Sequence, residues 1–336
     1  MTKFKKAACF TDIHFGMKNN ARQHNIDCEN FVDWFILEAK KRDCETCFFL
    51  GDWHHQRSAI NISTLNYSIS NLKKLNEAFE TVYFIVGNHD LFYRDKREIS
   101  SVVFANEFTN IKVVDEWIVE NEVAIIPWLV GDEWRQIKKI KCKYMFGHFE
   151  LPHFKMNAMV EMPDIGTIRS DHFKNVGHVF TGHFHKRQHS GNISYIGNPF
   201  PHNFADVWDD DRGAMFLEWD KKPEYKIWPD APRYRSINLS KLLDDPETVL
   251  EPNSYIRVKV DLDISYEEAN FIKENFAQNY NIRDLSLIPQ KKEEHAQEVE
   301  GEIHFESVDQ IVTNQLSKIE SDTFENNILI EIYNNL

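Results

Sequence analysis

Side chains of the kinds that bind metal ions follow several apolar runs of the chain. The segments are "CFTDIHFG", "FFLGDWHH", "FIVGNHD", "YMFGHF" and "VFTGHFH", and they carry Asp12, His14, Asp52, His54, His55, Asn88, His89, Asp90, His148, His183 and His185. Each segment alone is typical of a polar turn at the end of a buried strand. In open α/β sheets, however, ligands collect at the carboxyl ends of the strands, so these distant residues can converge. The five segments together therefore predict a metal centre.

The residue types in these segments limit the metals that such a centre can hold. Aspartate, histidine and asparagine form a mixed oxygen and nitrogen set that lacks thiolates, which argues against a structural zinc site. The set contains too many imidazoles for calcium or magnesium. Manganese, iron or zinc fit it, and the number of ligands suffices for two ions. Two ions that share a carboxylate suit an in-line displacement at phosphorus.

Strand-like and helix-like patterns alternate in the first two thirds of the chain. Apolar runs predict strands at 7–11, 46–50, 82–86, 123–126, 143–147, 178–181 and 193–196. Broad apolar faces predict helices at 29–42 and 61–79. This alternation implies parallel strands with helices on the faces of the sheet, and the later strands, which have fewer helices between them, indicate a second, more mixed sheet. The predicted fold class is α/β, in the form of an α+β sandwich.

The pattern changes after residue 204. The stretches "AMFLEW", "EYKIW", "YRSINL" and "YIRVKVDLD" are typical of short strands, and Ser265 is the expected N-cap of a helix that ends near Gln278. The segment "QKKEEHAQEVEGE" has almost no apolar residues, and two amphipathic helical patterns follow it. We therefore predict a main domain at 1–204, a small α/β domain at 205–289, an acidic linker at 290–306 and a helical segment at 307–336.

The formal net charge of −14 is unevenly distributed. Residues 1–204 carry a net charge of +1 and 13 of the 15 histidines, whereas residues 205–336 carry −15. Any polyanion should therefore meet the first part of the chain. The five scattered cysteines argue against a disulfide framework. No apolar run approaches the roughly 20 residues of a membrane span, and the N-terminal run is too short for a signal peptide, so we expect a cytoplasmic location.

Taken together, DxH, GD, GNHD, GH and GHxH resemble the five-part signature of the calcineurin-like metallophosphoesterases. The stretches "GDWHHQR", "GNHDLFY", "AIIPW", "FGHFEL", "TGHFH", and "YIGNPF" followed by "DDDRG", are similar to nuclease subunits of the SbcD type, and in particular to the phage recombination nucleases of that group. The resemblance covers about residues 7–220. It implies a calcineurin-like nuclease core of two mixed sheets flanked by helices, a small capping domain for DNA recognition and C-terminal helices.

The resemblance also implies a ligand set. The expected ligands of one ion are Asp12, His14 and His185, those of the other ion are Asn88, His148 and His183, and Asp52 is the expected bridging carboxylate. The two ions are expected to be Mn²⁺.

The same motifs imply catalytic roles for residues that do not bind metal. His89 matches the family's catalytic histidine, which stabilises the reacting phosphate or protonates the leaving oxygen. We expect Asp90 to orient the His89 ring through a hydrogen bond. His55 is expected to contact the phosphate, although related phage proteins tend to have aspartate there. His54 is expected to be exposed.

Other polar and aromatic residues near the motifs have weaker assignments. The histidines that match no ligand position are expected to be structural, and they are His153, His172, His178, His189 and His202. Candidates for contacts with nucleic-acid phosphates are Arg57, Arg94, Lys96, Arg97, Lys186 and Arg187. Phe92 and Tyr93 either stack on an unpaired base or pack in the core.

The implied function is a DNA exonuclease or endonuclease in recombination and double-strand-break repair. The implied partners are DNA, a second copy of the chain and an SMC-like ATPase of the SbcC type, which residues 307–336 would bind. If a phage encodes the chain, the expected location is the cytoplasm of the bacterial host. Two alternatives share the ligand set. One is a stand-alone metallophosphodiesterase or phosphatase with a small substrate, and the other is a non-catalytic subunit that binds DNA and anchors an ATPase.

Overall fold

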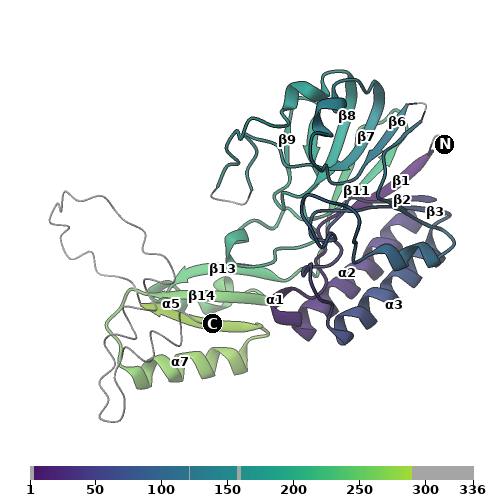
Figure 1. The fold of residues 1–336 in the computed structure, drawn as a ribbon. Coiled ribbons are helices and arrows are strands. Elements are labelled where there is room, and N and C mark those ends of the chain that lie inside the picture. The colour runs from purple at the N-terminus through teal and green to yellow at the C-terminus, as the bar shows by residue number, and fades with distance from the viewer. Residues whose placement is uncertain (1–3, 121, 157–159, 290–336) are drawn as a thin grey trace, which may run out of the picture. The chain divides into compact units, whose positions relative to one another are not determined.

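The computed structural model describes residues 4–120, 122–156 and 160–289 (Figure 1). These residues belong to one compact unit, Met1–Gln290. The predicted linker at 290–306 and the predicted helical segment at 307–336 lie outside the described residues. Within the described ranges, no helix combines the length and the apolar character that a membrane span requires.

The first sheet has six strands in the order β12-β11-β1-β2-β3-β4. Their bounds are β1 (Lys6–Phe10), β2 (Thr46–Phe49), β3 (Thr81–Ile85), β4 (Ile111–Val114), β11 (Gly213–Glu218) and β12 (Glu224–Ile227). Strands β1 to β4 are parallel, whereas β11 and β12 pair antiparallel, so the sheet is mixed. The parallel register brings the carboxyl ends of β1, β2 and β3 to one edge of the sheet.

Helices α2 (Arg22–Lys41) and α3 (Ile62–Ala78) cover one face of the first sheet (Figure 1). Helix α3 matches the predicted helix, and its N-cap Asn61 accepts a hydrogen bond from the Ser63 N–H. Helix α2 begins at Arg22, well before the predicted start at residue 29. Its first turns bury polar residues, including Asn25 and Asp27, which an apolar pattern cannot reveal.

The second sheet has the order β5-β6-β7-β8-β10-β9. Its strands are β5 (Ile118–Glu120), β6 (Val123–Ile126), β7 (Cys142–His148), β8 (Val176–Gly182), β9 (Gln188–Ser190) and β10 (Ile193–Tyr195). The four central strands are parallel and the two outer ones antiparallel. All seven strands predicted within the first 200 residues are confirmed. The strands that were not predicted there, β4, β5 and β9, are short edge strands with few buried side chains.

One apolar core lies between these two sheets. Apolar side chains of β1, β2 and β3 meet those of β6, β7 and β8, and the rings of Phe48 and Phe146 stack with their centroids 3.9 Å apart. Each such buried side chain stabilises the fold by about 1.5–3 kcal/mol. The predicted sandwich of two mixed sheets with helices on an outer face is therefore confirmed.

A small parallel sheet follows in the chain. It contains β13 (Arg233–Asn238), β14 (Ser254–Val260) and β15 (Asp284–Pro289), with α5 (Leu239–Asp244), α6 (Pro246–Val249) and α7 (Tyr266–Asn279). Ser265 caps α7 as predicted, in a capping box with Glu268. Strands β11 and β12 lie in the first sheet, although the boundary at residue 204 placed them with the small domain. The side chains of β11 are buried in the apolar clusters on both faces of that sheet, so this strand belongs to the main domain.

The small sheet contacts the first part of the chain through α1 and α2. Arg283, which precedes β15, forms a bidentate ion pair with Asp27 of α2, at 2.5 and 2.7 Å. The ammonium group of Lys18 lies 4.5 Å from the ring centroid of Tyr255 in β14. Lys18 lies in α1 (Met17–Asn20). The other helical turns of the described residues are α4 (Trp134–Ile137), η1 (Val103–Glu107), η2 (Ser170–Phe173) and η3 (Phe204–Asp206).

Candidate metal centre

The candidate ligands lie where central strands of the two main sheets end. Asp12 and His14 follow β1, Asp52 follows β2, Asn88 follows β3, His148 ends β7, and His183 and His185 follow β8. Backbone hydrogen bonds join the first two loops, because Asp12 N–H donates to Gly51 O at 2.9 Å and His14 N–H to Asp52 O at 3.1 Å. The parallel strands thus bring the predicted ligand residues together.

One group of possible ligand atoms comes from Asp12, His14 and His185. These atoms all lie within 4.8 Å of one another. The Nε2 atoms of the two histidines are 3.2 Å apart, and each lies 4.0 Å from Asp12 Oδ1. The carboxylate of Asp12 also accepts the His183 N–H at 3.0 Å, so the β1 loop holds the β8 loop in place.

A second group comes from Asp52, His148 and His183, with the Asn88 amide among them. Asn88 Oδ1 lies 3.0 Å from His148 Nε2 and 2.8 Å from His183 Nδ1. Asp52 Oδ2 lies 3.5 Å from His148 Nε2 and 3.7 Å from His14 Nε2. Asp52 therefore lies between the two groups, where a bridging carboxylate is needed.

The hydrogen bonds of His148 indicate that this arrangement fits a cation. Its Nδ1 donates to Leu50 O at 2.7 Å, so in the neutral ring Nε2 presents a lone pair. That lone pair faces the amide oxygen of Asn88 and the carboxylate of Asp52, which are acceptors as well. Acceptors that converge in a buried place are satisfied by a positive ion, and this oxygen and nitrogen set suits a transition metal.

The electrostatics of the buried groups lead to the same conclusion. Burial raises the pKa of Asp12 to about 7, and it lowers the pKa of His185 to about 4. Burial also acts to lower the pKa of His148, but the charge of Asp52 and its hydrogen bond outweigh it and raise that pKa to about 9. Burial thus opposes charge on Asp12 and His185, whereas Asp52 draws a positive charge to His148, and bound metal ions would supply that positive charge.

Several candidate ligands have left-handed backbone conformations. The φ angles are 52° for Asp12, 53° for His14, 63° for Asp52 and 91° for His183. Such conformations cost on the order of 1–3 kcal/mol each and tend to occur at functional sites. The backbone is also tightly packed here, because a Cβ at Gly87 would overlap the carboxylate and the N–H of Asp52.

His89 lies beside the ligand groups and is half-buried. Its Nδ1 donates to His55 O at 2.7 Å, and its N–H donates to Asp52 Oδ1 at 2.8 Å. The rings of His55 and His89 stack with a centroid distance of 5.4 Å, and ring nitrogens of both lie within 4.8 Å of one on His14. These two histidines therefore form one wall of the site.

The expected hydrogen bond from Asp90 to the His89 ring is wrong. The ring is held by the His55 carbonyl, and the fully buried Asp90 carboxylate accepts four backbone N–H groups. The donors are Gly87, Asp52 and Trp53, each at 2.9 Å, and His54 at 3.2 Å. Burial, and then the charge of Asp52, raise the pKa of Asp90 to about 7, whereas these N–H groups favour the carboxylate. Asp90 thus holds the loop backbones that carry the ligands.

His54 is buried, which corrects the expectation that it is exposed. Only 1% of its surface is accessible, and its ring nitrogens lie 3.0 Å from Ser68 Oγ and 3.0 Å from Ser101 Oγ. Ser68 belongs to α3, and Ser101 follows the GNHD loop. His54 therefore joins α3 to the segment that carries Asn88 and His89.

Two residues that the sequence interpretation did not assign to the site contact it. His202 is fully buried, and its ring centroid lies 5.1 Å from that of His185 and 5.6 Å from that of His14. The guanidinium of Arg212, also fully buried, donates to the carbonyl of His185 and to Asn198 Oδ1. Arg212 lies in the "DDDRG" segment that carried the resemblance, and His202 follows the "GNPF" segment by two residues, so these segments were the available signal.

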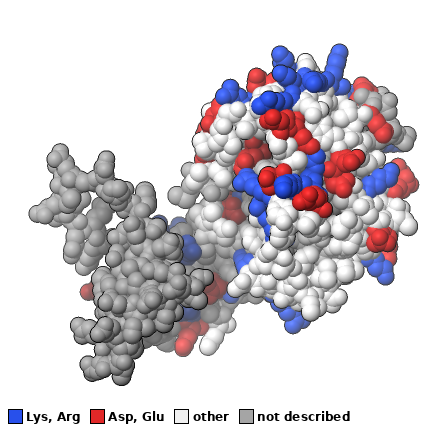
Figure 2. All heavy atoms as spheres, in the orientation of Figure 1, with Lys and Arg blue, Asp and Glu red and all other residues white. Residues whose placement is uncertain are grey.

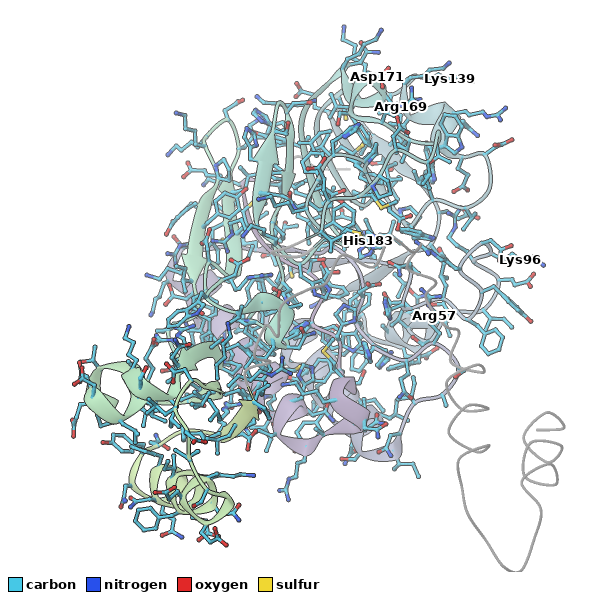
Figure 3. The ribbon with its side chains drawn as sticks, turned by 90° about the vertical axis from the view of Figure 1, so that its left-hand side faces the viewer. Arg57, Lys96, Lys139, Arg169, Asp171 and His183 are labelled. Carbon is cyan, nitrogen blue, oxygen red and sulfur yellow. The ribbon has the colours of Figure 1, made fainter. Side chains whose placement is uncertain are left out.

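The flanking cations are mostly engaged in ion pairs. Arg94 pairs with Glu150 at 2.7 Å, Lys186 with Asp209 at 2.8 Å, and Arg187 with Asp211 at 2.5 Å; Arg97 pairs with Glu133. Within the described ranges, Arg57 and Lys96 form no ion pair. Figure 3 shows both to the right of His183, with Lys96 on a loop that projects outward. Phe92 and Tyr93 are 43% and 41% exposed, so they are not core residues.

One curated protein is similar to this chain by sequence. No protein-family model matches the chain. "Exonuclease subunit 1" of Enterobacteria phage T4 is 29% identical over 219 residues, which cover 62% of this chain and 62% of that protein. The chain thus matches less than two thirds of the length of this relative.

Three solved structures are similar at lower identity. A nuclease from Pseudomonas putida, named MPE, is 22% identical, with 56% of this chain and 66% of that chain covered and a TM-score of 0.30. A dimetal phosphatase from Danio rerio is 10% identical, with coverages of 64% and 93% and a TM-score of 0.38. A phosphoesterase from E. coli is 12% identical, with coverages of 64% and 89% and a TM-score of 0.32. All three TM-scores lie below 0.5.

Proposed function

We propose that this chain is a two-metal-dependent nuclease that hydrolyses phosphodiester bonds of DNA. The observation that carries this proposal is the position of Asp52, whose Oδ2 lies 3.7 Å from His14 and 3.5 Å from His148, between two groups of ligand atoms. A shared carboxylate holds two divalent ions close enough to act on one phosphate. The similarity to Exonuclease subunit 1 of phage T4 supports DNA as the substrate.

Different residues of the chain would have different roles in such a reaction. Two divalent ions would neutralise charge on the phosphate and activate the attacking water. The proposed ligands are Asp12, His14 and His185 for one ion, Asn88, His148 and His183 for the other, and Asp52 for both. His55 O accepts from His89 Nδ1 and so fixes the ring, and in the protonated ring Nε2 can donate to the leaving oxygen. The adjacent His55 ring would contact the phosphate.

The distribution of charge is compatible with a nucleic-acid substrate. Figure 2 shows basic and acidic side chains interspersed on the visible face of the described residues, and the part of the chain with the metal ligands, 1–204, is nearly neutral. Two divalent ions would make the site locally positive. Arg57 and Lys96, which form no ion pair with described residues, are the proposed contacts to DNA phosphates.

The finer parts of the proposal rest on the resemblance to SbcD-type nucleases. They are Mn²⁺ as the metal, a homodimer, docking of an SMC-like ATPase on residues 307–336, and a role in recombination and double-strand-break repair. A cytoplasmic location likewise stays a prediction. Deletion of residues 303–336 tests the docking, since the truncated chain should no longer co-purify with the ATPase. Retained co-purification would contradict it.

A nuclease assay tests the activity. Metal-free protein should be inactive, and added Mn²⁺ should restore cleavage of linear duplex or single-stranded DNA. His89→Ala should still bind two Mn²⁺ ions but lose activity by about 100-fold or more, because it removes the proposed acid. His153→Ala, at an exposed histidine, is the matched control and should behave as the wild type.

The alternatives predict different results in the same assay. A stand-alone phosphodiesterase would hydrolyse a nitrophenyl phosphodiester but leave DNA intact. A non-catalytic subunit would bind Mn²⁺ and DNA and cleave neither substrate. Unchanged DNA cleavage by His89→Ala would remove His89 from the mechanism.

A further inference from the structure

A cavity of about 170 Å³ lies beside the candidate metal ligands. Two of its lining residues belong to the site. His148 has its Nε2 3.5 Å from Asp52 Oδ2, and Glu150 has its Oε1 3.3 Å from His183 Nε2. A phosphate at the metal centre would therefore place the rest of its nucleotide within reach of this cavity.

Most of the cavity wall is apolar and aromatic. Its apolar lining residues are Trp128, Leu129, Trp134, Phe149, Ile165 and Ile168. The Trp128 ring is held from several sides, since its Nε1 donates to Arg94 O at 2.9 Å and its centroid lies 5.1 Å from that of His183. The Arg94 guanidinium lies 5.4 Å from the same ring and is itself paired with Glu150. Such a fixed aromatic wall suits stacking with a planar ligand.

The size and the polar groups of the cavity limit the kinds of ligand that it can bind. An apolar cavity of about 150 Å³ suffices to bind benzene, so this one has room for a six-membered ring with small substituents. Glu150 lines the cavity with a carboxylate whose Oε1 contacts Arg94 and His183. Thr167 also lines the cavity, and its hydroxyl forms no hydrogen bond with any described residue, so the hydroxyl is free to donate to or accept from a ligand. A largely apolar and aromatic cavity that is also lined by a carboxylate and a threonine has the features of a nucleobase site.

We propose that this cavity binds the base of the nucleotide that flanks the scissile phosphate, a proposal that rests on the proposed nuclease function. A base that is stacked and paired in a duplex cannot enter a side cavity, so the bound base must be unpaired. The substrate class is therefore a single-stranded or frayed DNA end. A larger cavity, of about 260 Å³, is not part of this proposal. Its lining residues include Lys6 and Cys44, which lie near the amino ends of β1 and β2, whereas the metal ligands follow the carboxyl ends of these strands.

Two substitutions test the cavity without touching a candidate ligand. Thr167→Phe fills it, and Trp134→Ala removes one wall. Trp208→Ala is the matched control, because Trp208 is 57% exposed and does not line the cavity. The substrates are a single-stranded oligonucleotide and copies of it in which one abasic residue is moved along the terminal positions. Cleavage with Mn²⁺ gives kcat/KM, and a Mn²⁺ titration checks that each variant still binds metal.

For the wild type we expect an abasic residue to lower kcat/KM about tenfold at one position, next to the cleaved bond, which corresponds to about 1.4 kcal/mol of lost stacking. In Thr167→Phe the intact oligonucleotide should be cleaved about tenfold more slowly, and the abasic penalty should vanish. Trp134→Ala should show a smaller loss of the same kind, and Trp208→Ala none.

Two results would overturn the inference and leave the nuclease function intact. One is an equal rate for all abasic substrates with the wild type, and the other is an undiminished abasic penalty in Thr167→Phe. If the wild type cleaves no DNA, the proposed function fails instead. The cavity is then tested by binding alone, because 2-aminopurine in a single strand should be quenched by the wild type and not by Thr167→Phe.

Discussion

Replacing Arg212 with methionine tests whether a buried cation positions a metal ligand. The fully buried guanidinium donates to the His185 carbonyl and to Asn198 Oδ1, and it pairs with Asp206 Oδ1 at 3.0 Å and with Asp209 Oδ2 at 2.9 Å. These contacts connect the loop of a candidate ligand to the segment that follows β10.

The burial of both partners sets the expected magnitude. An exposed ion pair contributes about 0–1 kcal/mol. Here the Asp206 side chain is only 4% exposed, so Arg212→Met leaves a buried carboxylate without its partner, which costs about 3–5 kcal/mol. For a unit of this size the loss corresponds to a decrease in Tm on the order of 10 °C. Methionine fills much of the same volume, so a new cavity adds little. Adding Asp206→Asn removes the unpaired charge and should restore part of the stability.

The assay combines unfolding with metal binding. Urea and thermal unfolding give the loss of stability, and calorimetric titration gives the Mn²⁺ affinity, which we expect to fall by about 10- to 100-fold because the His185 loop loses its support. Arg42→Met is the matched control. Arg42, which follows α2, pairs with Glu38 and Glu224. Glu38 keeps Lys41 as a partner and Glu224 is 56% exposed, so Arg42→Met leaves no buried charge unpaired and should cost less than Arg212→Met and leave the affinity unchanged.

Two results would refute this reasoning. If Arg212→Met and Arg42→Met destabilise the protein equally, the burial of the Arg212 ion pairs does not add to the cost of losing them. If Arg212→Met is destabilised but binds Mn²⁺ as the wild type does, Arg212 stabilises the fold without positioning His185.

Three other substitutions give shorter tests. Gly87→Ala should abolish tight Mn²⁺ binding, because the added Cβ would overlap Asp52, and near-normal affinity in a titration would contradict this close packing. Asp90→Asn should lower the free energy of unfolding by about 2–3 kcal/mol, because an amide NH₂ replaces one carboxylate oxygen and each oxygen accepts two backbone N–H groups. Unchanged urea unfolding would show that Asp90 does not hold these loops. Arg283→Met should weaken the contact of the small sheet with α2 by leaving Asp27 unpaired, and hydrogen exchange in β14 and β15 that stayed as slow as in the wild type would argue against it.

The predicted elements were those with a strong local pattern. The buried central strands are continuous apolar runs, and α3 repeats apolar residues at helical spacing with Asn61 as its cap. The edge strands β4, β5 and β9 and the polar first turns of α2 lack such patterns, since their partners come from elsewhere in the fold. The boundary at residue 204 separated β11 from its sheet for the same reason, because its antiparallel pairing with β1 joins residues far apart in the chain.

The sequence by itself determined which residue types stand at the strand ends, and hence the choice of Asp12, His14, Asp52, Asn88, His148, His183 and His185 as candidate ligands. Only the tertiary structure decided where their neighbours point. Asp90 turns inward to backbone N–H groups, His54 is buried between Ser68 and Ser101, and His202 and Arg212 approach the ligand loop from a later segment. The direction of a side chain after a strand depends on the φ angles of the turn, such as the left-handed conformations of Asp12 and Asp52. It also depends on the partners that tertiary packing brings next to it. The local pattern of residue types determines neither of these.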